Sequence, residues 1–265
     1  MIRATDKSSS SKNKIPLAMG LAILYTAIMG VGMYIMHHIN GGMYGNAEMV
    51  DTLWWILIIL TLLTMGSIVK FFSWPEVGFK KLNWSQLWWA LPWTANIIYI
   101  WFAIIGHLMT HTLGAEQWRT LGMIAFTTLL VGIAEELMYR GIALHSLLGQ
   151  FSLRKAILLS ALAFSLLHSV NFLGGLAFQD VLEQLIDTFI FGVAFACLVL
   201  RQNNLWPAIL LHWQGDCVAF LIGYLAIPDH QLQFYGIFLF AGRALTVLLL
   251  VKAKPSKAPN LSRQN

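Results

Sequence analysis

Charged residues are scarce in this sequence: Asp, Glu, Lys and Arg together make up 11% of its 265 residues. A soluble domain carries about 25% charged residues. Hydrophobic residues account for 58% of the chain, and its mean hydropathy is +0.67. So little polar surface cannot cover so large an apolar fraction in water. The shortage of charge therefore excludes an ordinary soluble enzyme and predicts a protein that lies in a lipid bilayer.

Cysteine is scarce too, because the chain contains only Cys197 and Cys217, and both lie within apolar runs. Two residues cannot form a zinc-binding cysteine cluster. Their apolar surroundings indicate small buried hydrophobic side chains and not a disulfide. The sequence also lacks internal repeats and a separate soluble domain, so any function must reside in the membrane-embedded part.

Eight apolar segments are long enough to cross a bilayer as helices, which takes roughly 20 residues each. The first of them is too long for the apolar core of a signal peptide, which runs to about 15 residues. We therefore expect an all-α, polytopic membrane helix bundle. The predicted spans are about Ile15–Met36, Leu53–Phe72, Trp88–Met109, Leu121–Leu148, Lys155–Leu173, Val181–Leu200, Pro207–Ile227 and Leu232–Val251.

The basic residues predict how this bundle is oriented. Lys and Arg occur in both tails and in every second connection, whereas the other connections carry none or, in one case, only Arg119. By the positive-inside rule, both termini are cytoplasmic and the number of spans is even. A basic cytoplasmic face also accounts for the net charge of +5 without a nucleic-acid partner. The predicted division is a disordered basic N-tail at 1–14, a single transmembrane bundle at 15–251 and a basic C-tail at 252–265.

Ionisable residues inside the spans are few and are spaced by helical turns. Glu136 and Arg140 lie four residues apart, so they share a helix face and can pair, whereas Glu135 points about 100° away. His212 and Asp216 have the same spacing. At a rise of 1.5 Å per residue, these residues and a histidine of the fifth span, His168, lie at overlapping depths. Three helices can therefore bring them into one polar chamber.

A charge in hydrocarbon costs roughly 2.5–3.5 kcal/mol on insertion scales, so such a cluster indicates a functional site. Two structural alternatives stay open: an ion pair can serve as a lock, and a lone histidine can be an interhelical hydrogen-bond donor. Proton-coupled transporters form an alternative functional class, because they also use intramembrane Glu, His and Arg. The discontinuous helices and matching halves that are typical of transporters are not apparent here.

Three motifs in chain order resemble the CAAX protease and bacteriocin-processing (CPBP/ABI) family of intramembrane proteases. The segment NLWPAILLHW, which ends at Trp213, resembles bacterial members of this family. The resemblance covers about Leu121 to Phe220, the expected protease core at 121–220. The motifs are Glu135-Glu136-x-x-x-Arg140, Phe164-x-x-x-His168 and His212-x-x-x-Asp216.

The resemblance implies that Glu135 and His168 activate the attacking water, while Glu136 and Arg140 orient and neutralise the site. It further implies that His212 and the residue at position 216 stabilise the oxyanion. Eukaryotic members often have Asn at this last position, whereas this chain has Asp. An ionised Asp cannot donate a hydrogen bond. Either this Asp is protonated, or it orients the neighbouring histidine as an acceptor.

The resemblance leaves the cofactor open between no metal and a divalent ion such as zinc. Glu135, His168 and His212 resemble a thermolysin-type ligand set, although no HExxH motif occurs. The implied partners are the bilayer and a membrane-associated peptide or protein substrate, and the implied location is a bacterial cytoplasmic membrane. Prenylated CAAX proteins, leader peptides, pheromone precursors and bacteriocins are all candidate substrates. A non-catalytic immunity or scaffold role within the family is a further alternative.

Overall fold

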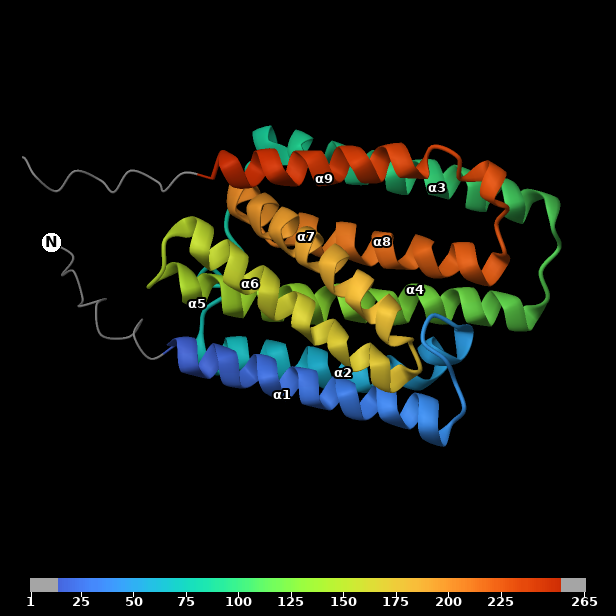
Figure 1. Cartoon of the computed structure of the whole chain (residues 1–265), viewed down its shortest axis with the longest axis horizontal. Helices are drawn as coiled ribbons and strands as arrows, with labels where there is room; N and C mark the ends of the chain where they lie inside the picture. The colour runs from blue at the N-terminus through green and yellow to red at the C-terminus, as the bar shows by residue number, and fades with distance from the viewer. Residues whose placement is uncertain (1–13, 254–265) are drawn as a thin grey trace, which may run out of the picture.

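The computed structural model describes residues 14–253, and within this range the chain forms a bundle of helices without a β-strand. The predicted N-tail up to residue 13 and the predicted C-tail from residue 254 lie outside the described residues. The described chain begins and ends at the same end of the bundle (Figure 1). This placement agrees with an even number of crossings.

The elements follow one another along the chain with short connections. Several long helices contain a π-helical or 3₁₀ segment at one end, labelled η. Their bounds are α1 Lys14–Tyr34, η1 Ile35–Ile39, α2 Ala47–Phe71, η2 Trp84–Ala90, α3 Leu91–Thr110, α4 Ala115–Glu135, η3 Glu136–Ala143, α5 Leu144–Leu148, α6 Leu153–Leu167, η4 His168–Gly174, α7 Phe178–Gln202, α8 Trp206–Leu225, η5 Asp229–Gln231 and α9 Tyr235–Val251.

The prediction of a polytopic helical membrane protein is confirmed. In the described part of the chain, seven helices are long and apolar enough to cross a membrane, and α9 is a shorter apolar helix of 17 residues. Several predicted bounds are displaced, because helices continue past the hydrophobic run: α2 begins at Ala47 and not at Leu53, and α4 at Ala115 and not at Leu121. The cytoplasmic placement of the termini stays a prediction.

The helices are arranged so that most of the expected protease core, residues 121–220, lies inside the bundle. Figure 1 shows α3 and α9 along one side of the bundle and α1 and α2 along the opposite side, with α4, α6, α7 and α8 between them. The most extensive helix contacts are α6 with α7, α4 with α8 and α2 with α4. The outer helices thus enclose a central group of four. This group, together with the segments η3 and η4 that follow α4 and α6, carries all the predicted site residues.

Two glycines allow helices of the central group to approach closely. A Cβ atom on Gly132 of α4 would lie 3.0 Å from the backbone nitrogen of Trp213 in α8. A Cβ atom on Gly192 of α7 would lie 2.9 Å from the Cα atom of Ala161 in α6. Small residues at such crossings let membrane helices pack backbone against backbone. The first crossing lies one helical turn from the two glutamates, so it sets how near α8 comes to them.

Candidate active site

A change of helix type separates the two adjacent glutamates. The α-helix α4 ends at Glu135, and the π-helical segment η3 begins at Glu136. The backbone N–H of Leu144 donates to the carbonyl of Tyr139, five residues earlier, as π-helical pairing requires. Single π-helical turns within α-helices are frequent at functional sites. Here the wider turn contains both members of the buried ion pair, Glu136 and Arg140.

Arg140 is held by charge and by aromatic rings. Its side chain is fully buried, and its Nη1 atom lies 3.0 Å from Oε1 of Glu136, which is also fully buried. The guanidinium carbon lies 3.9 Å from the ring centroid of Phe164, with Phe191 and Phe195 at 5.6 and 5.9 Å. Cation–π contacts become stronger when water is excluded. The rings and the carboxylate together compensate a charge that would otherwise be costly to bury.

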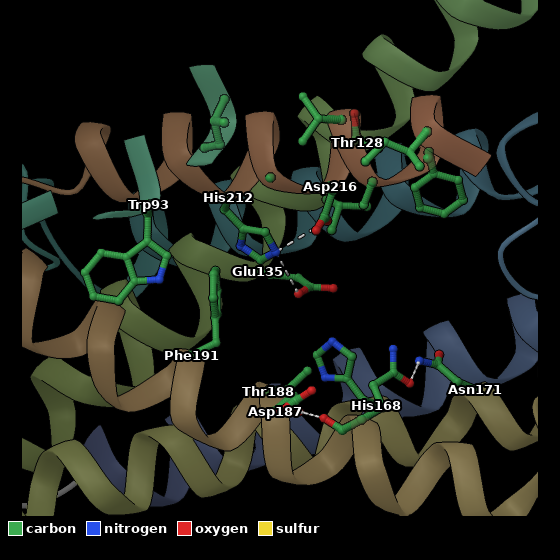
Figure 2. A pocket seen from close by; sticks show the side chains of 18 of the residues that line it. Trp93, Thr128, Glu135, His168, Asn171, Asp187, Thr188, Phe191, His212 and Asp216 are labelled. Carbon is green, nitrogen blue, oxygen red and sulfur yellow. Dashed lines mark hydrogen bonds and ion pairs between the residues drawn. The ribbon is translucent and has the colours of Figure 1, made fainter. Parts of the chain in front are cut away.

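His212 connects this ion pair to the second glutamate. Its Nδ1 atom lies 2.8 Å from Oε1 of Glu136. A carboxylate only accepts, so Nδ1 carries the proton and donates. On the other side of the ring, Nε2 lies 3.8 Å from Oε2 of Glu135 and 3.5 Å from Oδ2 of Asp216 (Figure 2). One imidazole therefore has three carboxylates around it, two of which face its second nitrogen.

His168 approaches from the opposite wall. Its Nδ1 atom lies 3.1 Å from the carbonyl oxygen of Phe164. A carbonyl only accepts, so the proton must reside on Nδ1, and Nε2 of the neutral ring has a free lone pair. Figure 2 shows the ring of His168 directed across the open space toward Glu135. The histidine thus presents a hydrogen-bond acceptor to whatever occupies that space.

The space between these walls is a cavity of about 640 Å³. Glu135, His168, His212 and Asp216 line it, whereas Glu136 and Arg140 do not and lie behind its wall. The structure therefore brings the six predicted residues together, with one glutamate facing the cavity and the other paired with arginine. Most of the remaining lining is apolar, and it comes from α1, α2, α3, α4, α6, η4, α7, α8 and α9.

The alternative metal site is not assembled in this arrangement. Within residues 14–253, no group of three or more His, Cys, Asp or Glu side chains is placed so that it could hold a metal ion. The residues predicted as ligands, Glu135, His168 and His212, lie on two opposite walls (Figure 2). The donor set does not fit a bound metal here, and metal use stays an untested prediction.

Among the polar lining residues that sequence reasoning missed, three are joined to one another by hydrogen bonds. Asn171 follows His168 by one 3₁₀ turn in η4, Gln184 lies on α7, and Tyr44 lies in the connection between η1 and α2. They are linked by two hydrogen bonds of 2.7 Å each. In the sequence these residues look like ordinary polar residues near helix ends, and no local spacing relates them.

One comparison with known proteins gave a match, and it covers the segment in which the predicted site residues lie. Residues 116–218 match the family model described as Type II CAAX prenyl endopeptidase Rce1-like. A comparison with curated proteins gave no match, and neither did a comparison with solved structures. The matched segment runs from the start of α4 into α8, so it contains all three motifs, whereas α1–α3 and α9 lie outside it. The protein is therefore a multi-pass integral membrane protein, and its residues 116–218 are similar to the Rce1-like family of CAAX endopeptidases.

Proposed function

We propose that this protein hydrolyses a peptide bond of a membrane-associated substrate, using a water molecule activated by Glu135 and His168. The family match supports an intramembrane endopeptidase of the CAAX type. The observation that supports this mechanism most directly is the different environment of the two neighbouring glutamates. Glu135 lines the cavity, whereas Glu136 is neutralised behind it by Arg140.

The charges around His212 favour Glu135 as the group that takes up a proton from the cavity. With Arg140 and an imidazolium at His212, the cluster has two positive charges against the three carboxylates of Glu135, Glu136 and Asp216. The excess negative charge lets the cluster accept one proton. Glu135 is the glutamate that a water molecule in the cavity can reach, and a carboxylate in an apolar cavity is a better base than one in water.

The reaction then has two proton transfers. An O–H bond of the water breaks and its proton moves to Glu135, while the water oxygen bonds to the peptide carbonyl carbon. The lone pair on Nε2 of His168 orients this water by accepting its second hydrogen. The carbonyl electrons move onto oxygen and form the oxyanion. When the intermediate collapses, the C–N bond breaks and Glu135 returns its proton to the leaving amine.

The oxyanion needs hydrogen-bond donors that are already in position. The Nε2–H of a protonated His212 is one such donor, since this atom faces the cavity. Glu136 accepts the proton on the other ring nitrogen and so fixes the orientation of the ring. Arg140 in turn holds Glu136. The ion pair therefore acts through His212 and does not touch the substrate.

The test is cleavage of an internally quenched CAAX peptide, with and without a prenyl group, by purified protein in detergent or liposomes. We expect cleavage by the wild type and background rates for His168→Ala. His107→Ala is the matched control, because His107 stacks on His111 at 3.9 Å and does not line the cavity. If no member of a panel that also includes leader peptides and bacteriocin precursors is cleaved by the wild type, the proposed function is wrong.

Metal use is tested in the same assay. The opposed positions of the candidate ligands support a mechanism without metal, so we expect that 1,10-phenanthroline leaves the cleavage rate unchanged. Inhibition by the chelator, reversed by added zinc, would assign a metal to the site.

A further inference from the structure

A chain of hydrogen bonds leads along the cavity wall to the hydroxyl of Tyr44. Nδ2 of Asn171 donates to Oε1 of Gln184, and Nε2 of Gln184 donates to Oη of Tyr44, each over 2.7 Å. The three residues come from η4, α7 and the connection between η1 and α2, and all three line the cavity. Asn171 is buried, with 4% of its surface exposed. The polar wall is therefore assembled from three separate parts of the chain.

Because both hydrogen bonds of this series point toward Tyr44, its hydroxyl proton is left without an acceptor among the described residues. The oxygen of Tyr44 accepts from Gln184, and within residues 14–253 no group accepts a hydrogen bond from the Tyr44 hydroxyl. Its proton is therefore available to an occupant of the cavity. Consecutive hydrogen bonds that run in one direction polarise each other, so the two amides make this hydroxyl a stronger donor. The backbone N–H of Tyr44 donates to the carbonyl of Gly174 over 2.9 Å and fixes the residue against η4.

The hydroxyl also lies within the electrostatic field of the catalytic cluster. Burial raises the pKa of Tyr44 to about 12, and repulsion by Asp216 and Glu135 adds to this rise. Tyr44 therefore keeps its proton at neutral pH and acts only as a neutral donor. Tyr44, Asp216 and Glu135 line the same cavity, so the hydroxyl and the two carboxylates can contact one occupant.

The Tyr44 hydroxyl can supply a hydrogen bond to the oxyanion that Asp216 does not supply. In the charge state that the proposed function gives it, Asp216 cannot donate a hydrogen bond to an oxyanion, whereas an amide at this position could. We propose that the hydroxyl of Tyr44, supported by Gln184 and Asn171, donates a hydrogen bond to the carbonyl oxygen of the cleaved peptide bond as it becomes an oxyanion. The inference rests on the proposed function and adds a substrate-contacting residue from outside the family-matched segment.

A purely structural role would attach the 40–46 connection to the bundle without contributing to the reaction. The chain offers a matched control for that alternative. Oη of Tyr99 donates to the carbonyl of Gln231 over 2.7 Å and ties α3 to the connection before α9, and Tyr99 does not line the cavity. Phe at position 44 removes the hydrogen bond from Gln184, and Phe at position 99 removes the bond to the Gln231 carbonyl and a longer one of 3.4 Å from the Phe234 N–H. Only the change at Tyr44 removes a donor from the cavity.

The experiment compares Tyr44→Phe with Tyr99→Phe in the peptide-cleavage assay. We expect kcat of Tyr44→Phe to fall by about 10²-fold, as for removal of one oxyanion donor, with KM changed by less than about threefold. Tyr99→Phe should keep wild-type kcat, although it should lower the unfolding temperature at least as much as Tyr44→Phe does. Equal kcat for Tyr44→Phe and wild type, or equal losses in the two variants, would overturn the proposal.

A double variant sharpens the test. Asn at position 216 adds an N–H donor where the ionised carboxylate has none. Asp216→Asn should therefore raise kcat in the Tyr44→Phe background by at least about tenfold relative to its effect in the wild type. Independent effects of the two changes would refute a shared oxyanion.

The same assay separates failure of this inference from failure of the proposed function. If the wild type cleaves peptide and His168→Ala does not, an unchanged kcat in Tyr44→Phe contradicts this inference alone. If the wild type is inactive on the whole panel, the proposed function itself fails.

Discussion

Glu135 and Glu136 are neighbours in the sequence but lie in two regions that differ in access to the cavity and in charge compensation. The cavity wall contains Glu135 and Asp216, with His168 opposite, and its carboxylates are only partly compensated. Behind it lies an ion-pair layer of Glu136 and Arg140, which is fully buried and closely matched in charge. His212 joins the two regions through its two ring nitrogens. Under the proposed mechanism, the reactive groups lie at the open face, and the buried layer behind them fixes their geometry.

Replacing the cavity-facing glutamate should separate activity from stability most clearly. Glu135→Gln keeps the size and polarity of the side chain but removes the base, so cleavage should fall by about 10²–10⁴-fold. The unfolding temperature in detergent should not fall, because a neutral amide costs less to bury than a carboxylate. Glu116→Gln is the control, since Glu116 lies in the first turn of the same helix and is exposed.

Retained cleavage in Glu135→Gln would show that the cavity wall is not the reactive region. A fall in stability as large as the fall in activity would instead support the alternative that the cluster only locks the helices together.

Breaking the ion-pair layer should instead lower stability strongly. Arg140→Met leaves Glu136 buried without its guanidinium, which typically costs about 3–5 kcal/mol of stability. The double variant Glu136→Gln/Arg140→Met removes both charges and should recover much of that loss. Thermal or denaturant unfolding in a fixed detergent measures both variants. A double variant that is less stable than Arg140→Met would mean that the pair does not act as a unit.

The contact between α4 and α8 sets the distance between the two regions, and it can be perturbed by one methyl group. In Gly132→Ala the new Cβ atom would lie 3.0 Å from the backbone of Trp213, so the helices must move apart. Overpacking of this kind costs about 1–3 kcal/mol, and the separation between His212 and both glutamates should increase with it. We expect kcat to fall by about tenfold, since small misplacement of reacting groups is costly.

Gly122→Ala is the matched control, because Gly122 lies on the same helix and has no atom within 4 Å of the added Cβ position. This change should leave cleavage unaltered and add up to about 1 kcal/mol of helix stability. If the two alanine variants behave alike, the close approach of α4 and α8 is not what positions the site.

Much of the cavity wall and of the ion-pair layer was predictable from sequence. The i,i+4 spacing of Glu136 and Arg140 predicted their pairing, and the rotation between adjacent residues predicted that Glu135 would face elsewhere. The bundle class followed from hydropathy, because long apolar runs can satisfy backbone groups in lipid only as helices. These features share one property: each depends on local periodicity within a single helix.

Features that depend on contacts between distant segments were not predictable in the same way. The π-helical turn η3 has no composition that separates it from an α-helix, since the choice rests on its surroundings in the bundle. Tyr44 and Gln184 are 140 positions apart, and Arg243 finds its ion-pair partner Asp187 on another helix. No spacing rule within a helix connects such residues. Their roles appear only when α7 and its neighbours are in place.

The smallest effect is expected at the surface, far from both regions, where Lys14 at the start of α1 donates to Glu76 over 2.7 Å. The Lys14 hydrogen bond lowers the pKa of Glu76 below its ordinary value. The resulting stabilisation is therefore present above the ordinary pKa of about 4.3 and is lost as the pH falls through the lowered value. The Glu76 side chain is 52% exposed, so the pair contributes at most about 1 kcal/mol.

Glu76→Gln should therefore lower the free energy of unfolding slightly at pH 7. This difference should disappear at an acidic pH below the lowered pKa of Glu76, where the wild-type carboxylate is protonated as well. Cleavage at pH 7 should equal that of the wild type, because the pair contacts neither the cavity wall nor the ion-pair layer. Unfolding midpoints of both proteins at the two pH values decide the question. A stability difference that persists at the acidic pH would mean that Glu76 acts through its hydrogen bonds with Ser73 and not through its charge.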